Sequence, residues 1–369
     1  MVNCMNEIYG MRGDQMKKRL GLVYGGKSAE HEVSLSTARA VTQALDLEKY
    51  EVLPIYITMQ GEWLKGAPLE GPVDEMETLR LKKEGTPEPD HIEGFLAGDM
   101  PDVILPLLHG TNGEDGTVQG LFEVLNLPYA GNGVLASSAG MDKVVMKQLF
   151  AQAGLAQVEY VHFIRSAWQD DAESLLDMAE KTLPYPMFVK PANLGSSVGI
   201  SKADDRESLR KAIELALKFD RKIIVEKGIT AREIEMAVLG NDHPEVSIAG
   251  EIRPVAEFYD YEAKYQDQST ELSIPAEVPV SVAEHMKDMA IRAFKVLDCA
   301  GLVRADFFVT SDNEVLINEV NTLPGFTPTS MFPLLWQKSG VAYPDLIDRL
   351  IDLAIERHAE KQQLHYTMD

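Results

Sequence analysis

Short apolar runs alternate with amphipathic, helix-like segments through the first third of the chain. The apolar runs have the length of buried strands, and the segments between them repeat their apolar residues at helical spacing. Ser28 stands near the start of the first such segment and is a candidate N-cap. The predicted strands are 19–26, 50–58 and 101–110, and the predicted helices are 28–45 and 117–127. This alternation predicts a parallel α/β unit with binding sites at the carboxyl ends of its strands.

The rest of the chain predicts two further units. In the middle unit we expect helices at 141–154, 169–182 and 206–219 and strands at 159–164, 186–192 and 222–228. In the last unit we expect strands at 232–240, 244–252, 302–309 and 314–320 and helices at 281–297 and 343–360. The predicted fold class is therefore α/β (α+β), in three domains.

Domain boundaries follow from the same pattern. The expected divisions are an extension with no role in the fold at 1–18, an N-terminal α/β domain at 19–131, a central domain at 132–229 and a C-terminal domain at 230–369. The polar, irregular stretch at about 60–100 is expected to be a surface insertion. The tyrosine-rich stretch at about 255–275 is expected to be a loop.

Composition and charge narrow the possible functions. Apolar residues make up 45% of the chain and charged residues 25%, as in an ordinary globular protein. The 58 acidic and 35 basic residues give a net charge of −23, which argues against binding to nucleic acid or to a membrane. The two cysteines, Cys4 and Cys299, suit a reducing compartment. With no apolar run of about 18 residues and no signal peptide, we expect a cytoplasmic protein.

The most informative stretch is a predicted β-hairpin between 301 and 325. A two-residue turn at Asp312–Asn313 places Asp306 opposite Glu319, and Arg304 opposite Asn321, on one face. Two carboxylates about 5 Å apart repel by roughly 3 kcal/mol at an effective dielectric constant near 20. A bound divalent cation would turn this repulsion into attraction, and an all-oxygen set suits Mg²⁺. A solvated polar face, with Arg304 neutralising the acids, remains the alternative.

The stretch "VKPANLGSSVGISK" (189–202) has the composition of a phosphate-binding loop without the spacing of a P-loop. Lys190 ends an apolar strand, and the small residues that follow would let backbone amides approach a polyphosphate. An ordinary flexible connection is the alternative. Farther on, Glu226 and Lys227 could recognise an adenine and Glu233 a ribose, although each signal is weak alone.

These pieces, in this order, resemble the ATP-grasp superfamily and, within it, the D-alanine–D-alanine ligase family, from residue 19 to the C-terminus. Seven blocks in register carry the resemblance, which is far more specific than any one of them. They are "GGKSAEHEVSL" (25–35), "LHGTNGEDGTVQG" (108–120), "MDK" (141–143), the loop 189–202, "FYDYEAKY" (258–265), "RADFF" (304–308) and "NEVNTLPGFTPTSMFP" (318–333).

The resemblance implies an ATP site between the central and C-terminal domains. It assigns ATP contacts to Lys143, Lys190, Ser196, Ser197, Glu226, Lys227, Ile229, Glu233 and Lys264. It assigns two Mg²⁺ ions, replaceable by Mn²⁺, to Asp306, Glu319 and Asn321. The segment at 255–275 would be a lid that carries Lys264 to the γ-phosphate.

The resemblance also implies two D-alanine sites. Glu30 would hold the ammonium group of the first D-alanine, with Val33 and His109 beside it, and Ser330 and Met331 would help to form the second site. Arg304 and the amide of Gly325 would stabilise the oxyanion. Glu30, Ser196 and Tyr265 would form a hydrogen-bonded set that ties the lid to the other domains.

The implied activity is ATP-dependent ligation of two D-alanine molecules through D-alanyl phosphate, for peptidoglycan synthesis, by a cytoplasmic homodimer. A ligase that uses D-lactate or D-serine as second substrate is the main alternative. A regulator without catalysis would be expected to lack Arg304 or a metal ligand, and none is missing. The run "GNGVLA" (131–136) fits a loose dinucleotide fingerprint but does not follow the first strand, so a linker is the expectation.

Overall fold

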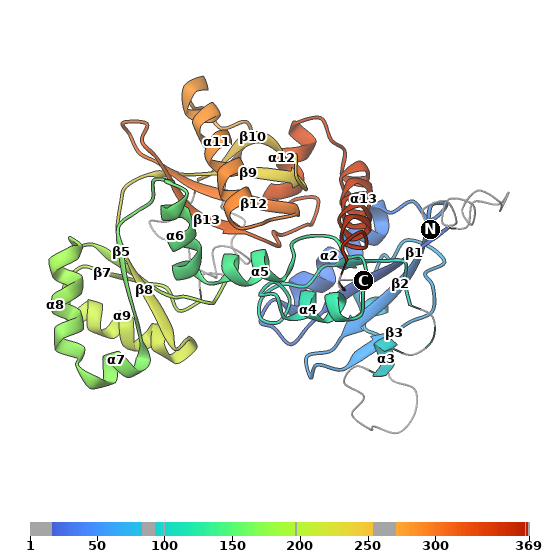
Figure 1. Cartoon of the computed structure of the whole chain (residues 1–369), viewed down its shortest axis with the longest axis horizontal. Helices are drawn as coiled ribbons and strands as arrows, with labels where there is room; N and C mark the ends of the chain where they lie inside the picture. Colours follow the sequence, from blue (N-terminus) through green and yellow to red (C-terminus); the bar gives the residue numbers. More distant parts are fainter. Residues whose placement is uncertain are drawn as a thin grey trace.

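The computed structural model describes residues 17–82, 93–96, 98, 100–195, 198–253, 271–365 and 367. Their strands form three sheets of four, four and five strands, which Figure 1 shows in three separate parts of the molecule. One sheet is mixed and mainly parallel, and the other two are antiparallel. The predicted α/β (α+β) class is confirmed.

The first sheet has the strand order β3-β2-β1-β4. Its strands are β1 (Lys18–Gly25), β2 (Tyr50–Ile57), β3 (Trp63–Lys65) and β4 (Val103–Pro106). The helices of this part are α2 (His31–Ala44), η1 (Met76–Leu79), α3 (Glu93–Leu96) and α4 (Thr117–Val124). Strand β1 pairs in parallel with β2 and β4, whereas β3 joins the edge antiparallel. The parallel unit is as predicted, with one unpredicted edge strand.

Two details of this part differ from the predictions. Helix α2 begins at His31 rather than near Ser28, whose Oγ accepts a hydrogen bond from the Glu30 N–H at 3.1 Å. The stretch expected to be a surface insertion contributes buried Val73, Leu79 and Phe95 to the core. Its apolar residues are too widely spaced to form a periodic pattern, so only packing reveals them.

The second sheet has the strand order β5-β8-β6-β7 and is antiparallel throughout. Its strands are β5 (Tyr160–Ile164), β6 (Met187–Pro191), β7 (Ser201–Ala203) and β8 (Lys222–Lys227). Its helices are α7 (Arg165–Asp170), α8 (Ala172–Thr182) and α9 (Arg206–Phe219). Asp205 caps α9 through a capping box with Ser208. The three predicted strands are confirmed, and β7 is an addition.

The third sheet has the strand order β11-β10-β9-β12-β13. Its strands are β9 (Arg232–Gly240), β10 (Glu245–Arg253), β11 (Glu271–Ser273), β12 (Gly301–Val309) and β13 (Val315–Asn321). The associated helices are α5 (Val134–Met141), α6 (Lys143–Gln152), α11 (Val280–Val296), α12 (Met331–Lys338) and α13 (Tyr343–Lys361). Met146 and Phe150 of α6 share a buried cluster with Phe307 of β12. Helix α6 therefore packs on this sheet, next to the second one (Figure 1).

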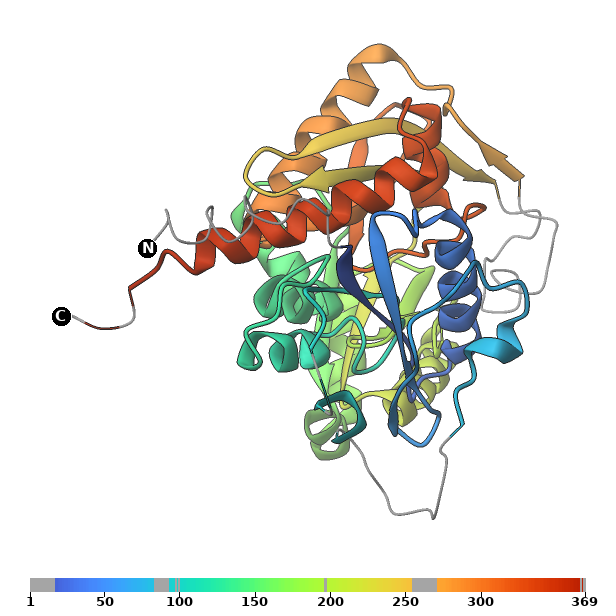
Figure 2. The same ribbon diagram turned by 90° about the vertical axis from the view of Figure 1, so that its right-hand side faces the viewer.

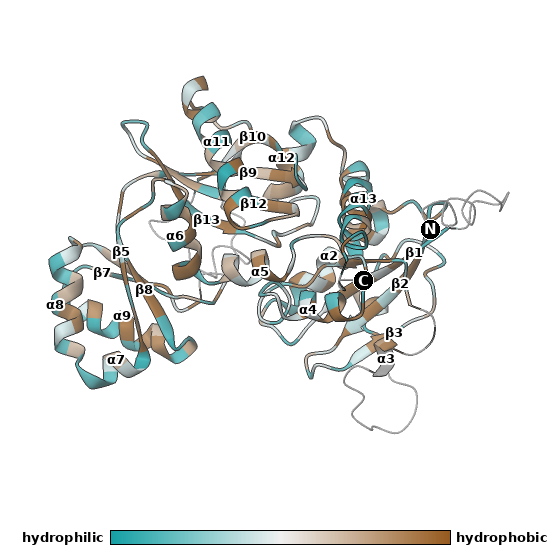
Figure 3. Cartoon of the chain, viewed as in Figure 1, coloured by the Kyte–Doolittle hydropathy of each residue, from teal (hydrophilic) through white to brown (hydrophobic). Residues whose placement is uncertain are grey.

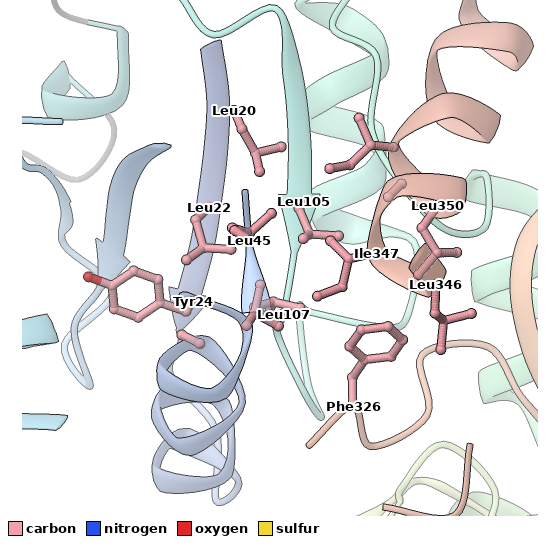
Figure 4. Packing of buried hydrophobic residues seen from close by; sticks show 14 of the residues in the cluster. Leu20, Leu22, Tyr24, Leu45, Leu105, Leu107, Phe326, Leu346, Ile347 and Leu350 are labelled. Atoms are coloured by element: carbon pink, nitrogen blue, oxygen red, sulfur yellow. The ribbon is translucent and has the colours of Figure 1, made fainter. Parts of the chain in front are cut away.

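Helix α13 joins the C-terminal part of the chain to the first sheet. It lies across the start of β1 in the rotated view (Figure 2), where Lys18 lies 3.5 Å from Asp352. Ile347 and Leu350 of α13 point toward Leu105 of β4 in Figure 4, within one buried cluster that also includes Leu20 and Phe326. Its other face is hydrophilic, as Figure 3 shows. Apolar burial thus fixes the first sheet against the C-terminal helices.

The connection from the first sheet to α5 passes directly behind β12. Gly131 has a φ of +97°, and a Cβ on Gly301 would lie 2.9 Å from the Gly131 Cα, so the two backbones touch. Buried Asn132 donates from Nδ2 to the carbonyls of Leu302 and Thr322, both at 2.7 Å. Its Oδ1 accepts from the Ala300 N–H at 3.0 Å. Residues 131–133 are thus a packed connection, as expected, whereas residues 134–136 form the start of α5, where Val134 and Leu135 are exposed.

Replacing Asn132 by alanine should destabilise the protein. The Asn132→Ala change leaves two carbonyls and one N–H buried without a partner, which should lower the free energy of unfolding by about 2–4 kcal/mol. Urea denaturation followed by circular dichroism measures the loss. The exposed Asn193→Ala change is the control, and an equal loss in the two variants would contradict this role.

Candidate functional site

The hairpin of β12 and β13 places the predicted residues opposite one another. Asp306 pairs with Glu319, and Arg304 pairs with Asn321, as predicted. The turn itself was predicted wrongly, because the ladder near it pairs Phe307 with Ile317. A β-bulge between Asp306 and Phe307 restores the expected register at the site. The predicted pairs are therefore correct, although a simple two-residue turn is not what produces them.

Arg304 is held by two carboxylates from neighbouring strands. Its Nε and Nη2 donate to the two Asp306 oxygens at 2.8 and 2.7 Å, and its Nε lies 3.0 Å from Glu235 Oε2 of β9. The side chains are only 17%, 13% and 5% exposed, so this face is largely shielded from water, while Arg304 does neutralise the acids as the alternative expected. Asp306 and Glu235 outweigh the effect of burial and hold the pKa of Arg304 above its usual value. The guanidinium is therefore fixed in the site.

Two of the predicted phosphate-binding lysines flank this hairpin. Lys143 Nζ, from α6, lies 3.7 Å from Glu319 Oε2 and donates to the Leu194 carbonyl at 3.0 Å. Lys190, at the end of β6, pairs with Glu226 of β8 at 2.5 Å. Burial lowers the pKa of Lys190, but Glu226 and Glu319 raise it above the usual value. Lys190 is therefore positively charged, and both lysines lie close to acids of this region, Lys143 to Glu319 and Lys190 to Glu226.

Glu226 also binds a lysine that the sequence analysis did not select. Lys147 of α6 is only 1% exposed, and its Nζ lies 2.8 Å from Glu226 Oε1. Burial would raise the pKa of Glu226, but Lys147 and Lys190 lower it to about 2. The sequence does contain a signal for Lys147. It follows Lys143 by one helical turn, so the two lysines lie on the same side of the helix.

Glu30 and His109, which are predicted to bind D-alanine, lie beside Gly110, at the carboxyl ends of the parallel strands of the first sheet. A Cβ built on Gly110 would lie 2.9 Å from Glu30 Oε2. His109 is 6% exposed, and its Nε2 has no hydrogen-bond partner in the described part of the chain. Burial lowers the pKa of His109, while Glu30 and a hydrogen bond with the Leu323 backbone raise it. Glu30 and His109 therefore face the same region.

Glu114 is a second acid in this region, and no role was assigned to it from the sequence. Its Oε1 accepts from the Gly110 N–H at 3.1 Å and would lie 3.4 Å from a Cβ on Gly195 of the phosphate loop. Burial raises the pKa of Glu114 to about 8, Glu30 adds to the increase, and Lys143 opposes it. Glu114 thus lies between the Glu30 region, Lys143 and the loop 189–202.

The segment after β13 holds the remaining predicted groups. Ser330 precedes α12, and its Oγ would lie 3.1 Å from a Cβ on Gly325. The same Oγ accepts from the Thr327 N–H at 3.2 Å, which closes the turn. Buried Met331 begins α12, and the Asn321 Oδ1 accepts from the Leu323 N–H at 3.1 Å.

Four further predicted residues lie on α2, on β8 or just after it, and on β9. Val33 is half-buried in the first turn of α2, and Ile229 is half-buried after β8. Lys227 pairs with Glu159 at 3.5 Å near the surface. Glu233 of β9 contributes to the raised pKa of Lys190, which places its charge near the site. The predictions for Ser196, Ser197, Lys264 and Tyr265 lie outside the described residues.

The donor set suits Mg²⁺ by its chemistry. Asp306, Glu319 and Asn321 offer only oxygen ligands, and Asp306 is paired with Glu319 in register. Across the described ranges, no three His, Cys, Asp or Glu side chains form a metal site by themselves. The set therefore depends on the Asn321 amide, and Arg304 must share Asp306 with any ion.

Comparison with known proteins identifies the family. The model described as "D-ala D-ala ligase N-terminus" matches residues 19–132, and the model described as "D-ala D-ala ligase C-terminus" matches residues 149–352. Together these two models cover most of the chain. The chain belongs to the D-alanine–D-alanine ligase family.

Similar proteins span the same length. The D-alanine–D-alanine ligase of Bacillus licheniformis is 59% identical over 360 residues, which cover 95% of this chain and 100% of the relative. That of Listeria monocytogenes is 57% identical over 369 residues, 96% of this chain and 100% of the relative. The solved D-alanine–D-alanine ligase of Coxiella burnetii has a TM-score of 0.79 at 35% identity, covering 94% and 96% of the two chains. The VanG D-Ala:D-Ser ligase of Enterococcus faecalis has a TM-score of 0.78 at 33% identity, covering 92% and 100%.

These comparisons confirm the predicted family, and with it an enzyme class of ATP-dependent ligases. The family uses ATP and Mg²⁺. None of the described helices combines the length and the apolar composition needed to cross a bilayer.

The buried proton on Glu114 should make stability depend on pH. Its pKa of about 8 exceeds the ordinary value, so the folded state keeps a proton that the unfolded chain loses. The free energy of unfolding is therefore highest at pH values below the pKa that Glu114 has in the unfolded chain. It falls by about 1–3 kcal/mol as the pH rises through about 8. Glu114→Gln should remove this part of the decrease in urea denaturation from pH 5 to about pH 9. The exposed Glu70→Gln is the control, and parallel curves for wild type and Glu114→Gln would contradict the assignment.

Proposed function

We propose that this protein joins two D-alanine molecules into D-alanyl-D-alanine, with ATP converted to ADP and phosphate, for peptidoglycan precursor synthesis. The carboxylate of the first D-alanine would become an acyl phosphate, which the amine of the second would attack. The observation that carries the proposal is the register of β12 and β13, which sets Arg304, Asp306 and Glu319 on one face beside Lys143. We also propose the three-domain division at 19–131, 132–229 and 230–369, and a cytoplasmic homodimer.

ATP would bind between the second and third sheets. Lys143 and Lys190 carry positive charge beside the phosphate loop and would offset charge on the phosphates. Asp306, Glu319 and Asn321 would hold Mg²⁺, which neutralises phosphate charge when bound. Glu226, Lys227, Ile229 and Glu233 would contact the nucleoside, and Ser196, Ser197 and Lys264 the phosphates.

D-alanine would bind between the first sheet and the segment after β13. Glu30 would accept hydrogen bonds from the first ammonium group, with Val33 and His109 beside the substrate. Arg304 and the Gly325 amide would stabilise the oxyanion of the tetrahedral intermediate. Ser330 and Met331 would border the second substrate. Ser196 and Tyr265 would connect Glu30 to the lid that carries Lys264, which would exclude water from the acyl phosphate.

A ligase for D-alanine and D-serine is the second candidate. The solved chain that carries this description has a TM-score of 0.78 with the present structure at 33% identity, so the same fold accommodates both substrates. Residues around Ser330 and Met331 would decide between them. The D-lactate alternative differs in its nucleophile, since a hydroxyl does not have to lose an ammonium proton.

The proposed activity should be specific for the D-isomer. ATP and Mg²⁺ with D-alanine should release phosphate and give a dipeptide identified by mass, whereas L-alanine should give neither. Mixed assays with D-serine and D-lactate from about pH 6 to about pH 9 test the second substrate, because an ammonium group has to lose a proton before it attacks, whereas the D-lactate hydroxyl carries no such charge. A mixed product in preference to D-alanyl-D-alanine would overturn the D-alanine assignment.

Arg304→Lys should separate catalysis from ATP binding. Lysine keeps the positive charge beside Asp306 and Glu235 but lacks the planar guanidinium group, which donates through several nitrogens at once. We expect kcat to fall by about 100-fold, as for a lost oxyanion donor, with KM for ATP nearly unchanged. Arg232→Lys is the matched control, since Arg232 binds Glu251 in the same bidentate way. Equal turnover in wild type and Arg304→Lys would rule out the oxyanion role.

A further inference from the structure

A buried lysine outside the predicted site lies behind the nucleotide-binding residues. Lys147 is on α6, one turn after Lys143, and its side chain is 1% exposed. Its Nζ lies 2.8 Å from Glu226 Oε1 and 5.7 Å from the centre of the Tyr160 ring. A lysine this deeply buried is costly to keep charged unless a partner compensates it.

Glu226 divides its two oxygens between two lysines. Oε1 faces Lys147 of α6, and Oε2 faces Lys190 of β6 at 2.5 Å. Glu226 lies on β8, an inner strand of the sheet, in register with Tyr160 of β5 and Phe188 of β6. The three charged groups therefore come from three elements, and their positions are set by one buried anion.

The sum of charges in this group affects how strongly Lys190 attracts an anion, in addition to Glu319 and Glu233, which also act on Lys190. Glu226 and Lys190 alone would be a neutral pair, and the carboxylate would be free to turn both oxygens toward Lys190. Lys147 occupies one oxygen and adds one positive charge, so the group carries a net charge of +1. Lys190 then keeps an attraction for an anion in front of it.

We propose that Lys147 is a positioning residue for ATP, which acts through Glu226 by fixing its carboxylate and leaving the charge of Lys190 available to the phosphates. This inference rests on the proposed ATP site. Lys147 itself is too deeply buried to be assigned a contact with the nucleotide, and Lys143 of the same helix faces Glu319.

Lys147→Met tests the inference, because methionine fills the apolar part of the site without the charge. The dissociation constant of ATP is measured by calorimetric titration with Mg²⁺ and without D-alanine, so the test does not depend on turnover. We expect ATP binding to weaken by about tenfold. KM for D-alanine should change by less than about twofold, since Lys147 acts on the nucleotide side only. Lys211→Met, which removes an exposed charge, is the control.

The decisive comparison repeats the change in a Glu226→Gln background. If Lys147 acts through the Glu226 carboxylate, the Lys147→Met change in the Glu226→Gln background should alter ATP binding by less than about threefold. A tenfold loss in both backgrounds would overturn the proposal, because Lys147 would then act independently of Glu226. Unchanged ATP binding in folded Lys147→Met would overturn it too and leave only a structural role.

Two further measurements keep the outcomes distinct. If Lys147→Met does not fold, Lys147→Gln, which can donate to Glu226 without a charge, is compared in the same two backgrounds. If wild type binds ATP but forms no product from D-alanine, the proposed function fails while the titration still tests Lys147. If wild type does not bind ATP, both proposals fail.

Discussion

Mutual neutralisation of buried charges is the constraint on which this site depends. Arg304 is held between Asp306 and Glu235, and Glu226 between Lys147 and Lys190. Removing a charged group from water is costly, so each such group is stable only with its partners in place. Asp306 lies on the same strand as Arg304, but Glu235 comes from β9, and the Glu226 group joins β8, α6 and β6. The ion pairs between these elements also help to fix their relative positions.

This arrangement explains how a chain with a net charge of −23 can accommodate an anionic nucleotide. The overall field of the protein repels phosphate, so attraction must come from a few cations placed at short range. In the proposed site Lys143 and Lys190 would supply them, and each lies against an acid that limits its movement. Because these cations are already in position, little reorientation of charged groups is needed when charge develops during the reaction.

The fold brings the two halves of the site together through packing outside it. Asn132 ties the connection after the first sheet to the backbone of β12, and the Lys143 N–H donates to the Ala192 carbonyl, which ties α6 to the phosphate loop. Helix α13 buries its apolar face on the first sheet. The Glu30 and His109 region is therefore held against the Arg304 hairpin by a continuous core, and not by the polar contacts of the site alone.

The sequence by itself determined the local structure and most of the charged residues of the proposed site. Period-two alternation assigned the faces of β12 and β13, and the pairing of Asp306 with Glu319 is correct even though the turn is not. The order of the seven blocks was sufficient to identify the family. These features depend on neighbours in the chain or on a pattern of residue types, which a single sequence contains.

Only the tertiary structure decided which charges neutralise one another. Lys147 and Glu226 are far apart in the chain, and so are Arg304 and Glu235, and no periodic pattern encodes their contacts. The burial that raises the pKa of Glu114, and that brings Leu79 into the core, likewise arises from segments packed across long sequence separations. Local patterns specify which face of an element is buried, whereas the partner it meets depends on how all the elements pack.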